Sequence, residues 1–260
     1  MNLPKFREAK VAILPVPYEK TTSYKKGTKN APERILKASN ELEQYDEELE
    51  KEPYEVGITT LKEIKTLEGL EKLETNKFLI AIGGEHTITL PLVKRHPEEN
   101  LSILHIDAHA DLKDSFEGNK LSHACVMRRI SEFNKNITQV GIRSLSKEEH
   151  QFIKNNNIKS FFMKDLIYNT NYIREIISTL KEDVYITIDL DALDPSILPD
   201  VGTPEPGGLR YYQLLYLLKQ VFKQKNVVGV DLVELCPSKN TNSDYLVAKL
   251  IYKIIGYKFN

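Results

Sequence analysis

The sequence predicts an α/β protein with one mainly parallel sheet covered by helices on both faces. Two observations support this prediction. Eight short runs of β-branched and aromatic residues recur along the chain, and amphipathic segments separate them. Most of these runs are apolar throughout, which is typical of parallel strands buried on both faces. The 260 residues contain no internal repeat or interdomain linker, so we expect one domain over residues 1–260.

Each element is expected at a defined place in the chain. The strands are expected at residues 10–14, 54–58, 78–82, 101–107, 137–142, 158–163, 184–191 and 227–234. Helical periodicity predicts helices at 31–49, 210–224 and 243–255. Asn30 occupies a capping position before the first helix, and Pro32 lies in its first turn. The acid-rich segment 41–52 is interpreted as a solvated helix face.

Charge and composition argue against two classes of partner. The chain has 36 Lys and Arg and 37 Asp and Glu, a formal net charge of -1, so no basic excess indicates binding to nucleic acid or to an anionic membrane. No stretch approaches the roughly 18 apolar residues of a membrane span, and the N-terminus has no signal-like apolar core. The two cysteines, Cys125 and Cys236, are expected to be free thiols of a soluble cytoplasmic protein.

Three of the expected strands end in residues that commonly bind metals. These are His86 after the third strand, Asp107, His109 and Asp111 at the end of the fourth, and Asp189 and Asp191 at the end of the seventh. Ligands bind beyond the carboxyl ends of strands in open α/β sheets. Alternate residues of an extended chain face the same side, so the two-residue spacing lets each set point together. We therefore expect the six side chains to converge.

The charge of these residues indicates what they bind. At an effective dielectric constant of about 20, each close pair of aspartates repels by about 4 kcal/mol. Two divalent cations would cancel four carboxylates. Oxygen ligands outnumber imidazoles and no thiolate is involved, which favours a hard ion such as Mn²⁺ over Zn²⁺. One such motif alone is more often a cap or a hydrogen-bonding feature, but three motifs at three strand ends favour a site for two Mn²⁺ ions.

A two-metal site predicts hydrolysis. Two cations about 3.5–4 Å apart can share a water molecule and lower its pKa. Phosphoesters, amides and guanidinium groups are all attacked at such sites, so the substrate stays open at this point. No extended glycine-rich nest for phosphate accompanies the acids. The excess of carboxylates favours a cationic substrate.

Several other residues have two interpretations each. Glu234, after the eighth strand, could form a bidentate pair with a guanidinium. It could equally be an acid that caps a helix or lies at the surface. His123 can shuttle a proton at neutral pH, or be an ordinary residue at a helix start. His105 shares the orientation of the aspartate two residues later, so it is either a partner of that carboxylate or a core histidine. His96 and His150 are expected at the surface.

Six segments, in this order, resemble the signature blocks of the ureohydrolase family of arginases and agmatinases. They are GGEH, DAHAD, SHACVMRR, DLDALDP, GTPEPGG and DLVELCP, and the similarity also includes PVPYEKTTSYKKGTKNAPERI near the N-terminus. The resemblance therefore covers nearly the whole chain. It implies an arginase-like fold with three α/β/α layers and an eight-stranded sheet, a site for two Mn²⁺ ions, and a homo-oligomer that is a trimer or a hexamer.

The resemblance also assigns roles to individual residues. It implies that one Mn²⁺ is bound by His86, Asp107, Asp111 and Asp189, and the other by Asp107, His109, Asp189 and Asp191. Asp107 and Asp189 would bridge the two ions. The substrate guanidinium would be held by Glu234, with Thr203 close by. Proton transfer would involve His123, which could also contact substrate, and Asp111, which would relay a proton to the leaving amine.

Within the family, the loop before His123 separates substrates. Arginases typically carry asparagine where this chain has Lys113, so the loop looks like that of an agmatinase, which converts agmatine to urea and putrescine in polyamine biosynthesis. A cation at Lys113 could still meet a carboxylate. Arginine, guanidinobutyrate, aminopropylagmatine and formiminoglutamate are therefore alternative substrates.

Two other kinds of protein are alternatives to such an enzyme. Deacetylases share the fold class but resemble single-zinc sites without all six ligands, so the presence of His86, Asp111 and Asp191 argues against them. A non-catalytic relative would bind two Mn²⁺ ions and turn over no guanidine. The complete set of expected ligands disfavours this second alternative.

Overall fold

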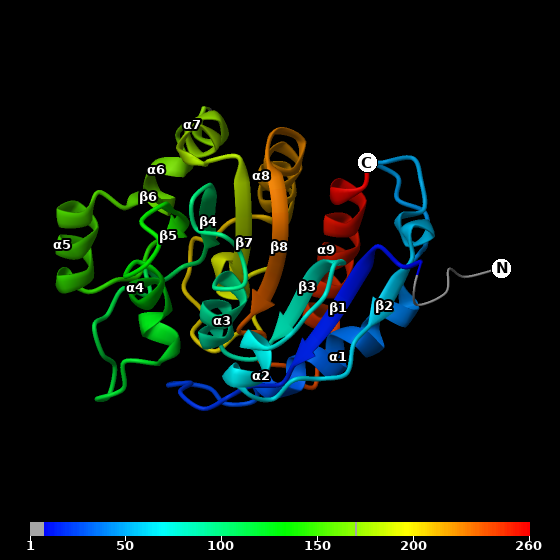
Figure 1. The fold of residues 1–260 in the computed structure, drawn as a ribbon, viewed down its shortest axis with the longest axis horizontal. Coiled ribbons are helices and arrows are strands. Elements are labelled where there is room, and N and C mark those ends of the chain that lie inside the picture. The colour runs from blue at the N-terminus through cyan, green and yellow to red at the C-terminus, as the bar shows by residue number, and fades with distance from the viewer. Residues whose placement is uncertain (1–7, 170) are drawn as a thin grey trace.

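The described part of the chain, residues 8–169 and 171–260 of a computed structural model, contains one eight-stranded sheet. Its strands are β1 (Val11–Val16), β2 (Ile58–Thr60), β3 (Phe78–Gly83), β4 (Leu101–Ile106), β5 (Ile137–Ile142), β6 (Lys159–Phe162), β7 (Asp183–Asp189) and β8 (Asn226–Val233). Every pairing is parallel, in the spatial order β2-β1-β3-β8-β7-β4-β5-β6 (Figure 1). The predicted fold class is confirmed.

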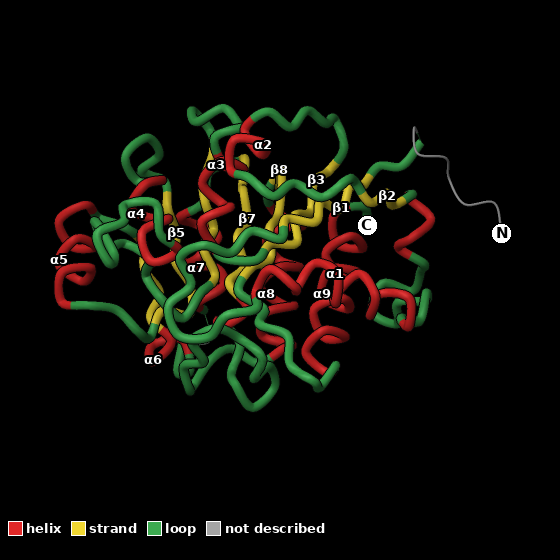
Figure 2. Tube along the Cα trace, turned by 90° about the horizontal axis from the view of Figure 1, so that it is seen from below, coloured by secondary structure: helices red, strands yellow, loops and turns green. Residues whose placement is uncertain are grey.

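Helices cover both faces of this sheet. They are α1 (Ala31–Ala38), α2 (Leu67–Glu71), α3 (Thr89–Val93), α4 (Val126–Ile130), α5 (Lys147–Asn156), α6 (Met163–Leu166), α7 (Tyr172–Thr179), α8 (Tyr211–Gln224) and α9 (Asn242–Lys258). Helices α1, α7, α8 and α9 pack on one face, and α2, α3 and α4 on the other (Figure 2). The result is the expected three-layer arrangement, and α8 and α9 match the predicted helices closely.

Strand alternation divides the hydrophobic core into two clusters. In β1, Val11 and Ile13 join a cluster with α1, α8 and α9, whereas Ala12, Leu14 and Val16 join a second cluster with α3 and α4. Each buried aliphatic side chain of this kind contributes about 1.5–3 kcal/mol by leaving water. Because both faces of the inner strands are buried, these strands need apolar residues at nearly every position.

The order of the central strands places the expected ligands together. Strands β3, β8, β7 and β4 are consecutive neighbours in the sheet. They end just before His86, Glu234, Asp191 and Asp107, respectively. Since the strands are parallel, these four ends meet at one edge. Strand β8 is last in the chain but lies between β3 and β7, so the sheet brings residues about 150 positions apart into contact.

The segment after α1 differs from the prediction. The helix expected at 31–49 ends at Ala38 and continues only as a 3₁₀ turn at Ser39–Glu41. In the acid-rich segment, Asp46 is fully buried. The Lys253 ammonium of α9, itself 2% exposed, lies 2.8 Å from Asp46 Oδ1 and 3.1 Å from Glu48 Oε2. The segment is therefore a loop held by a buried ion pair, so the predicted helix was wrong, although most of the other acids in the segment are exposed as expected.

Three smaller expectations are also corrected. The Asn30 side chain makes no capping hydrogen bond, because Asn30 already belongs to a 3₁₀ turn. The strand expected at 54–58 begins only at Ile58, after a 3₁₀ turn that starts at Pro53. His96 is half-buried, with its ring 5.6 Å from that of Tyr185, and this burial lowers the pKa of His96 to about 4. His150 is exposed, as expected.

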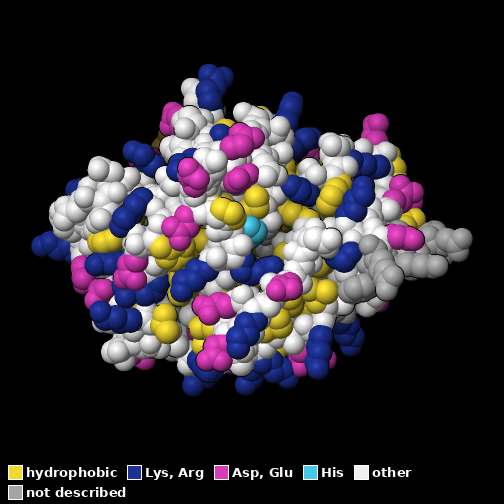
Figure 3. All heavy atoms as spheres, viewed as in Figure 1, with side chains coloured by type: hydrophobic (Ala, Val, Ile, Leu, Met, Phe, Trp, Pro, Cys, Tyr) yellow, Lys and Arg dark blue, Asp and Glu magenta, His cyan; other side chains and the backbone are white. Residues whose placement is uncertain are grey.

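The molecular surface carries charges of both signs. Basic and acidic side chains are interspersed over the face shown in Figure 3, consistent with the formal net charge of -1. Among the described residues, no helix is both long and apolar enough to cross a membrane. Both Cys125 and Cys236 are buried free thiols, as predicted.

The buried lysine yields a prediction about stability. Lys253→Met should lower the free energy of unfolding by about 3–5 kcal/mol, because it leaves the Asp46 carboxylate buried without a cation. The matched control is Lys249→Met, one turn earlier on α9, where the lysine is partly exposed. It should change stability by about 0.5 kcal/mol or less. Urea unfolding of both variants measures the difference, and equal losses would contradict the prediction.

Candidate active site

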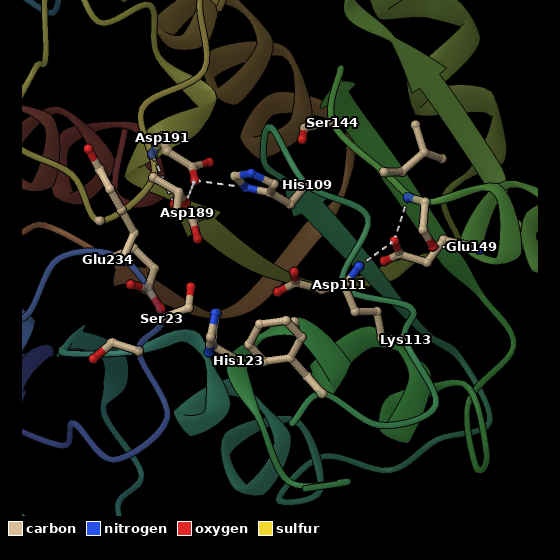
Figure 4. A pocket seen from close by; sticks show the side chains of 18 of the residues that line it. Ser23, His109, Asp111, Lys113, His123, Ser144, Glu149, Asp189, Asp191 and Glu234 are labelled. Carbon is tan, nitrogen blue, oxygen red and sulfur yellow. Dashed lines mark hydrogen bonds and ion pairs between the residues drawn. The ribbon is translucent and has the colours of Figure 1, made fainter. Parts of the chain in front are cut away.

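A pocket opens at the edge where the four central strands end. Its volume is about 370 Å³. The expected functional residues that line it are His109, Asp111, His123, Asp189, Asp191, Thr203 and Glu234. Figure 4 shows Asp189, Asp191 and Glu234 on one side of the pocket, with His109 and Asp111 opposite and His123 nearby. Asp107 and His86 are fully buried beneath them.

The first group of candidate ligands surrounds the His86 ring. His86 Nδ1 lies 3.1 Å from Asp111 Oδ2, 3.3 Å from Asp107 Oδ2 and 3.4 Å from Asp189 Oδ2. Potential ligand atoms of His86, His105, Asp107 and Asp111 all lie within 4.8 Å of one another. The structure therefore brings together three carboxylates and the imidazoles of His86 and His105, from the ends of three different strands.

A second group lies beside the first. His109 Nδ1 is 2.9 Å from Asp191 Oδ2 and 3.6 Å from Asp107 Oδ1, and the ligand atoms of these three residues also lie within 4.8 Å of one another. Asp107 belongs to both groups through different oxygens, which is the placement expected of a bridging carboxylate. Asp189 is in contact with His86 but outside the two compact groups.

Charge neutralisation dominates the electrostatics of this cluster. Burial, followed by the charges of Asp191 and Asp107, raises the pKa of Asp189 well above its usual value. Burial and Asp107 likewise raise the pKa of Asp191. Burial opposes protonation of His109, but Asp107 and Asp191 outweigh it and raise its pKa to about 12. The carboxylates therefore require positive charge nearby, as protons or as cations, and metal binding would release such protons.

The orientation of His86 fits a metal ligand. The Thr187 hydroxyl donates its proton to Asp231 Oδ1 at 2.6 Å, so it can accept the Nε2–H of His86 at 2.9 Å. His86 Nδ1 then faces the three carboxylates, but none of them meets hydrogen-bond geometry with it, so this buried nitrogen has no hydrogen-bond partner among the described residues. An unpartnered buried nitrogen is unusual in a folded protein unless it binds an ion. The donor set thus fits divalent cations.

Two non-glycine residues at the site have left-handed backbone. The φ angles are 53° at Asp111 and 66° at Glu234. Such conformations cost about 1–3 kcal/mol and persist where the surroundings impose them. Here the Asp111 carbonyl accepts the Arg128 amide at 3.1 Å, and the Glu234 amide donates to the Gly84 carbonyl at 2.8 Å. These bonds hold the two turns that carry the acids.

Glu234 lies against the metal-ligand cluster and also lines the pocket. Its Oε1 accepts the backbone N–H of His86 at 2.7 Å, while its side chain borders the cavity. Burial raises the pKa of Glu234 to about 8, opposed by the His86 amide. The Thr203 hydroxyl donates to Asp191 Oδ2 at 3.4 Å. An acid and a hydroxyl therefore lie beside the aspartates, and these are the two residues that the family resemblance assigns to the guanidinium.

Comparison with known proteins identifies this architecture. A family model described as the arginase family matches residues 9–256. The chain belongs to the arginase family. Its sequence is 40% identical over 275 residues to an N(1)-aminopropylagmatine ureohydrolase of Synechocystis, covering 97% of this chain and 90% of that one. It is 34% identical over 278 residues to an agmatinase of Pyrococcus horikoshii, covering 98% and 95%.

A solved structure agrees with these relatives. The agmatine ureohydrolase of Thermoplasma volcanium superposes with a TM-score of 0.88 at 31% sequence identity, covering 98% of this chain and 92% of that one. The expected enzyme class, a ureohydrolase of the arginase family, is thereby confirmed. The individual roles assigned to the site residues remain predictions.

The position of His123 at the pocket depends on two residues that the sequence did not single out, Thr21 and Glu85. The Thr21 hydroxyl donates to the buried Glu85 at 2.8 Å, so it accepts the backbone N–H of His123 at 3.0 Å. His123 Nδ1 lies 3.2 Å from the same hydroxyl. A side chain at Gly84 would clash with the backbone oxygen of Tyr18. The GGEH block therefore lets the N-terminal loop reach the site, and its glutamate fixes that loop.

The proline-rich loop at residues 194–209 is held by a single arginine. Arg143 Nη2 donates to the carbonyls of Asp191 and Glu205, each at 2.7 Å, and Nε donates to that of Pro206 at 3.0 Å. Asp194 Oδ2 accepts the amides of residues 207 and 208. Loop residue Thr203 is thus held at the pocket. The family resemblance implies a place for Thr203 beside the substrate, but nothing in the sequence indicated the part that Arg143 plays in holding this loop.

Lys113 lies at the far end of the pocket and is already paired. Its Nζ is 3.3 Å from Glu149 Oε2, and this contact is drawn in Figure 4. Glu149 is 3% exposed and also accepts the backbone N–H groups of Leu112 and Ser146. The positive charge at Lys113, which raised the question of a carboxylate substrate, is therefore balanced within the protein.

The ligand cluster yields a prediction about metal binding. Asp189→Asn should abolish the rise in melting temperature that Mn²⁺ produces, because the variant lacks one carboxylate of the cluster and ligand-linked stabilisation requires binding to the folded state. The same change at the exposed Asp165 of α6 is the control and should leave the shift intact. Thermal unfolding with and without Mn²⁺ measures both, and an unchanged shift in Asp189→Asn would remove that residue from the metal site.

Proposed function

We propose that this ureohydrolase hydrolyses the guanidinium group of a decarboxylated arginine derivative, either agmatine or its N1-aminopropyl form. Water would add to the guanidinium carbon, the bond from that carbon to the alkyl nitrogen would break, and urea and a protonated polyamine would leave. The observation that carries the proposal is the pocket itself, which combines the aspartate cluster with an additional acid, Glu234. Such a surplus of carboxylates suits a cationic substrate without a carboxylate of its own.

The proposed cofactor is a pair of Mn²⁺ ions. The donor set of carboxylates and imidazoles fits hard divalent cations, and the buried cysteines take no part in it. One ion would be held by His86, Asp107, Asp111 and Asp189, and the other by Asp107, His109, Asp189 and Asp191. When bound, the ions would supply an activated water molecule and charge stabilisation for the attack.

The remaining roles belong to the protein's own side chains. Glu234 would pair with the guanidinium, a charge-assisted contact, and Thr203 would lie beside it. Asp111 would pass a proton to the departing amine. His123, on the accessible side of the pocket, would exchange protons with solvent. Its contact with Thr21 would keep the ring at the pocket wall.

The substrate preference rests on the distal end of the pocket. Lys113 is paired with Glu149, so a substrate carboxylate would have to displace an existing ion pair. This favours agmatine over arginine, guanidinobutyrate and formiminoglutamate. The aminopropyl form is a second candidate, because the relative of that name is 40% identical whereas the named agmatinase is 34% identical. Both molecules present the same guanidinium and lack a carboxylate.

Two broader expectations belong to the same proposal. A homo-oligomer, trimeric or hexameric, remains a prediction of the family resemblance. Cytoplasmic location also remains a prediction, supported by two buried cysteines that are free thiols. A role in polyamine biosynthesis would follow if either proposed substrate is the preferred one.

The substrate proposal predicts a ranking of turnover. Urea release by Mn²⁺-loaded protein should be fastest with agmatine or N1-aminopropylagmatine, and at least tenfold slower with arginine and guanidinobutyrate, which bring a carboxylate to the Lys113–Glu149 pair. A metal-stripped sample is the control and should release no urea. Equal or faster turnover of arginine would overturn the substrate assignment. Turnover of none of these compounds would favour the formimino substrate or a non-catalytic relative.

The role of Glu234 gives a further prediction. Glu234→Gln should still bind Mn²⁺ but lower kcat/KM by about 10- to 150-fold, since a hydrogen bond to a charged group is worth about 1.5–3 kcal/mol. Glu182→Gln, the same change in an exposed residue just before β7 and at the opposite edge of the sheet from the pocket, should leave kcat/KM unaltered. Steady-state kinetics and Mn²⁺ titration on both variants separate substrate binding from metal binding. Unchanged kinetics in Glu234→Gln would exclude this residue from the mechanism.

A further inference from the structure

His105 is a fully buried histidine that the proposed mechanism leaves unused. It does not line the pocket, yet its Nε2 lies 2.7 Å from Asp107 Oδ2. From the sequence it could have been a core residue or a partner of the aspartate, and the contact shows that it is a partner. What the ring does for Asp107 depends on which nitrogen carries the proton.

The neighbouring Gln139 answers that question through its three partners. Gln139 Nε2 lies 2.7 Å from the Ala110 carbonyl oxygen, which can only accept, so this side of the amide must be the NH₂ group. Its Oε1 accepts the Ser160 hydroxyl at 2.9 Å. The second N–H of the amide then faces His105 Nδ1 at 3.0 Å. The amide orientation is fixed by contacts that do not involve the histidine.

We propose that Gln139 is a positioning residue of the metal site, which holds His105 in the tautomer whose Nε2–H donates to Asp107. Nδ1 accepts from Gln139, so the proton of the neutral ring lies on Nε2. The inference rests on the proposed role of Asp107 as the carboxylate shared by both ions. In the opposite tautomer the proton would lie on Nδ1. The lone pair of Nε2 would then face the Asp107 carboxylate, with no hydrogen between the two atoms.

The consequence for Asp107 is a fixed carboxylate that keeps its charge. His105 donates to Oδ2, and the His109 backbone N–H donates to Oδ1 at 2.5 Å. Each oxygen therefore has one neutral donor, and its other lone pair remains for an ion. Partners of this kind orient metal ligands and commonly change metal affinity by about 10- to 100-fold.

The sheet places these residues in register. His105 pairs with Gln139 across β4 and β5, and Gln139 pairs with Ser160 across β5 and β6. On the other side, His105 pairs with Thr187 and Thr187 with Asp231. One row of polar side chains thus crosses five strands, and two of its inner members, Thr187 and His105, contact His86 and Asp107. Strands β5 and β6, which supply no candidate metal ligand, contribute through this row.

The first test is the protonation of the His105 ring itself. In metal-free protein labelled with ¹⁵N at its six histidines, the His105 signals are those lost in His105→Asn. The proposal expects a protonated Nε2 and an unprotonated Nδ1. A protonated Nδ1 in the native protein overturns it. This readout uses neither substrate nor bound Mn²⁺, so it stands apart from the urea-release assay that tests the proposed function.

The second test compares three variants by calorimetric Mn²⁺ titration. Gln139→Met keeps the side-chain length and removes the donors, so it should weaken Mn²⁺ binding by about 10- to 100-fold. Thr138→Val is the matched control, because it removes a buried hydrogen bond to Thr179 on the opposite face of β5 and should stay within about twofold of the native protein. Ser160→Ala, which keeps both amide donors, should also stay close to native.

The Mn²⁺ titrations and the protonation of the His105 ring test the proposal in combination. Weak binding confined to Gln139→Met supports a positioning role. Equal Mn²⁺ affinity in Gln139→Met and Thr138→Val, with both variants folded, shows that Gln139 is only a core residue and overturns it. If Gln139→Met does not fold, the ring protonation of native His105 alone supports or overturns the proposal.

Discussion

The structure depends on the neutralisation of buried carboxylates at the edge of the sheet. Asp107, Asp189 and Asp191 are almost fully buried around the rings of His86 and His109, a placement that costs several kcal/mol per charge without compensation. Although burial opposes it, the acids raise the pKa of His86 and His109, whose protons supply part of the compensation, and the neutral His105 donates a hydrogen bond to Asp107. Divalent cations would supply the remainder, which allows acids at the edge of the sheet where the pocket opens to solvent.

Much of this arrangement follows from the sequence. Seven of the eight apolar runs predicted strands because most strands are buried on both sides, and the two-residue spacing of Asp107, His109 and Asp111 predicted a shared direction. The spatial order of the strands was not predictable from these local signals. Only the insertion of β8 between β3 and β7 brings Glu234 to the backbone of His86.

The failures of prediction have physical reasons of the same kind. Segment 41–52 reads as a charged helix because its partner, Lys253, is about 200 residues away and sits in an otherwise apolar helix. Thr21 and Glu85 were missed because each looks ordinary in its own segment, and their function appears only in the contact with His123. Local patterns predict elements and ligand types, whereas long-range contacts decide which residues support them.

The polar row across β8, β7, β4, β5 and β6 has a consequence for folding. Side chains alternate between the two faces of a strand, so a slip of one residue between β4 and β5 would replace Gln139 by Thr138 or Val140 opposite His105. A mispaired sheet would bury His105 without its amide donor and leave the aspartates poorly oriented for ions. Metal binding would then stabilise only those molecules whose strands have reached their native alignment.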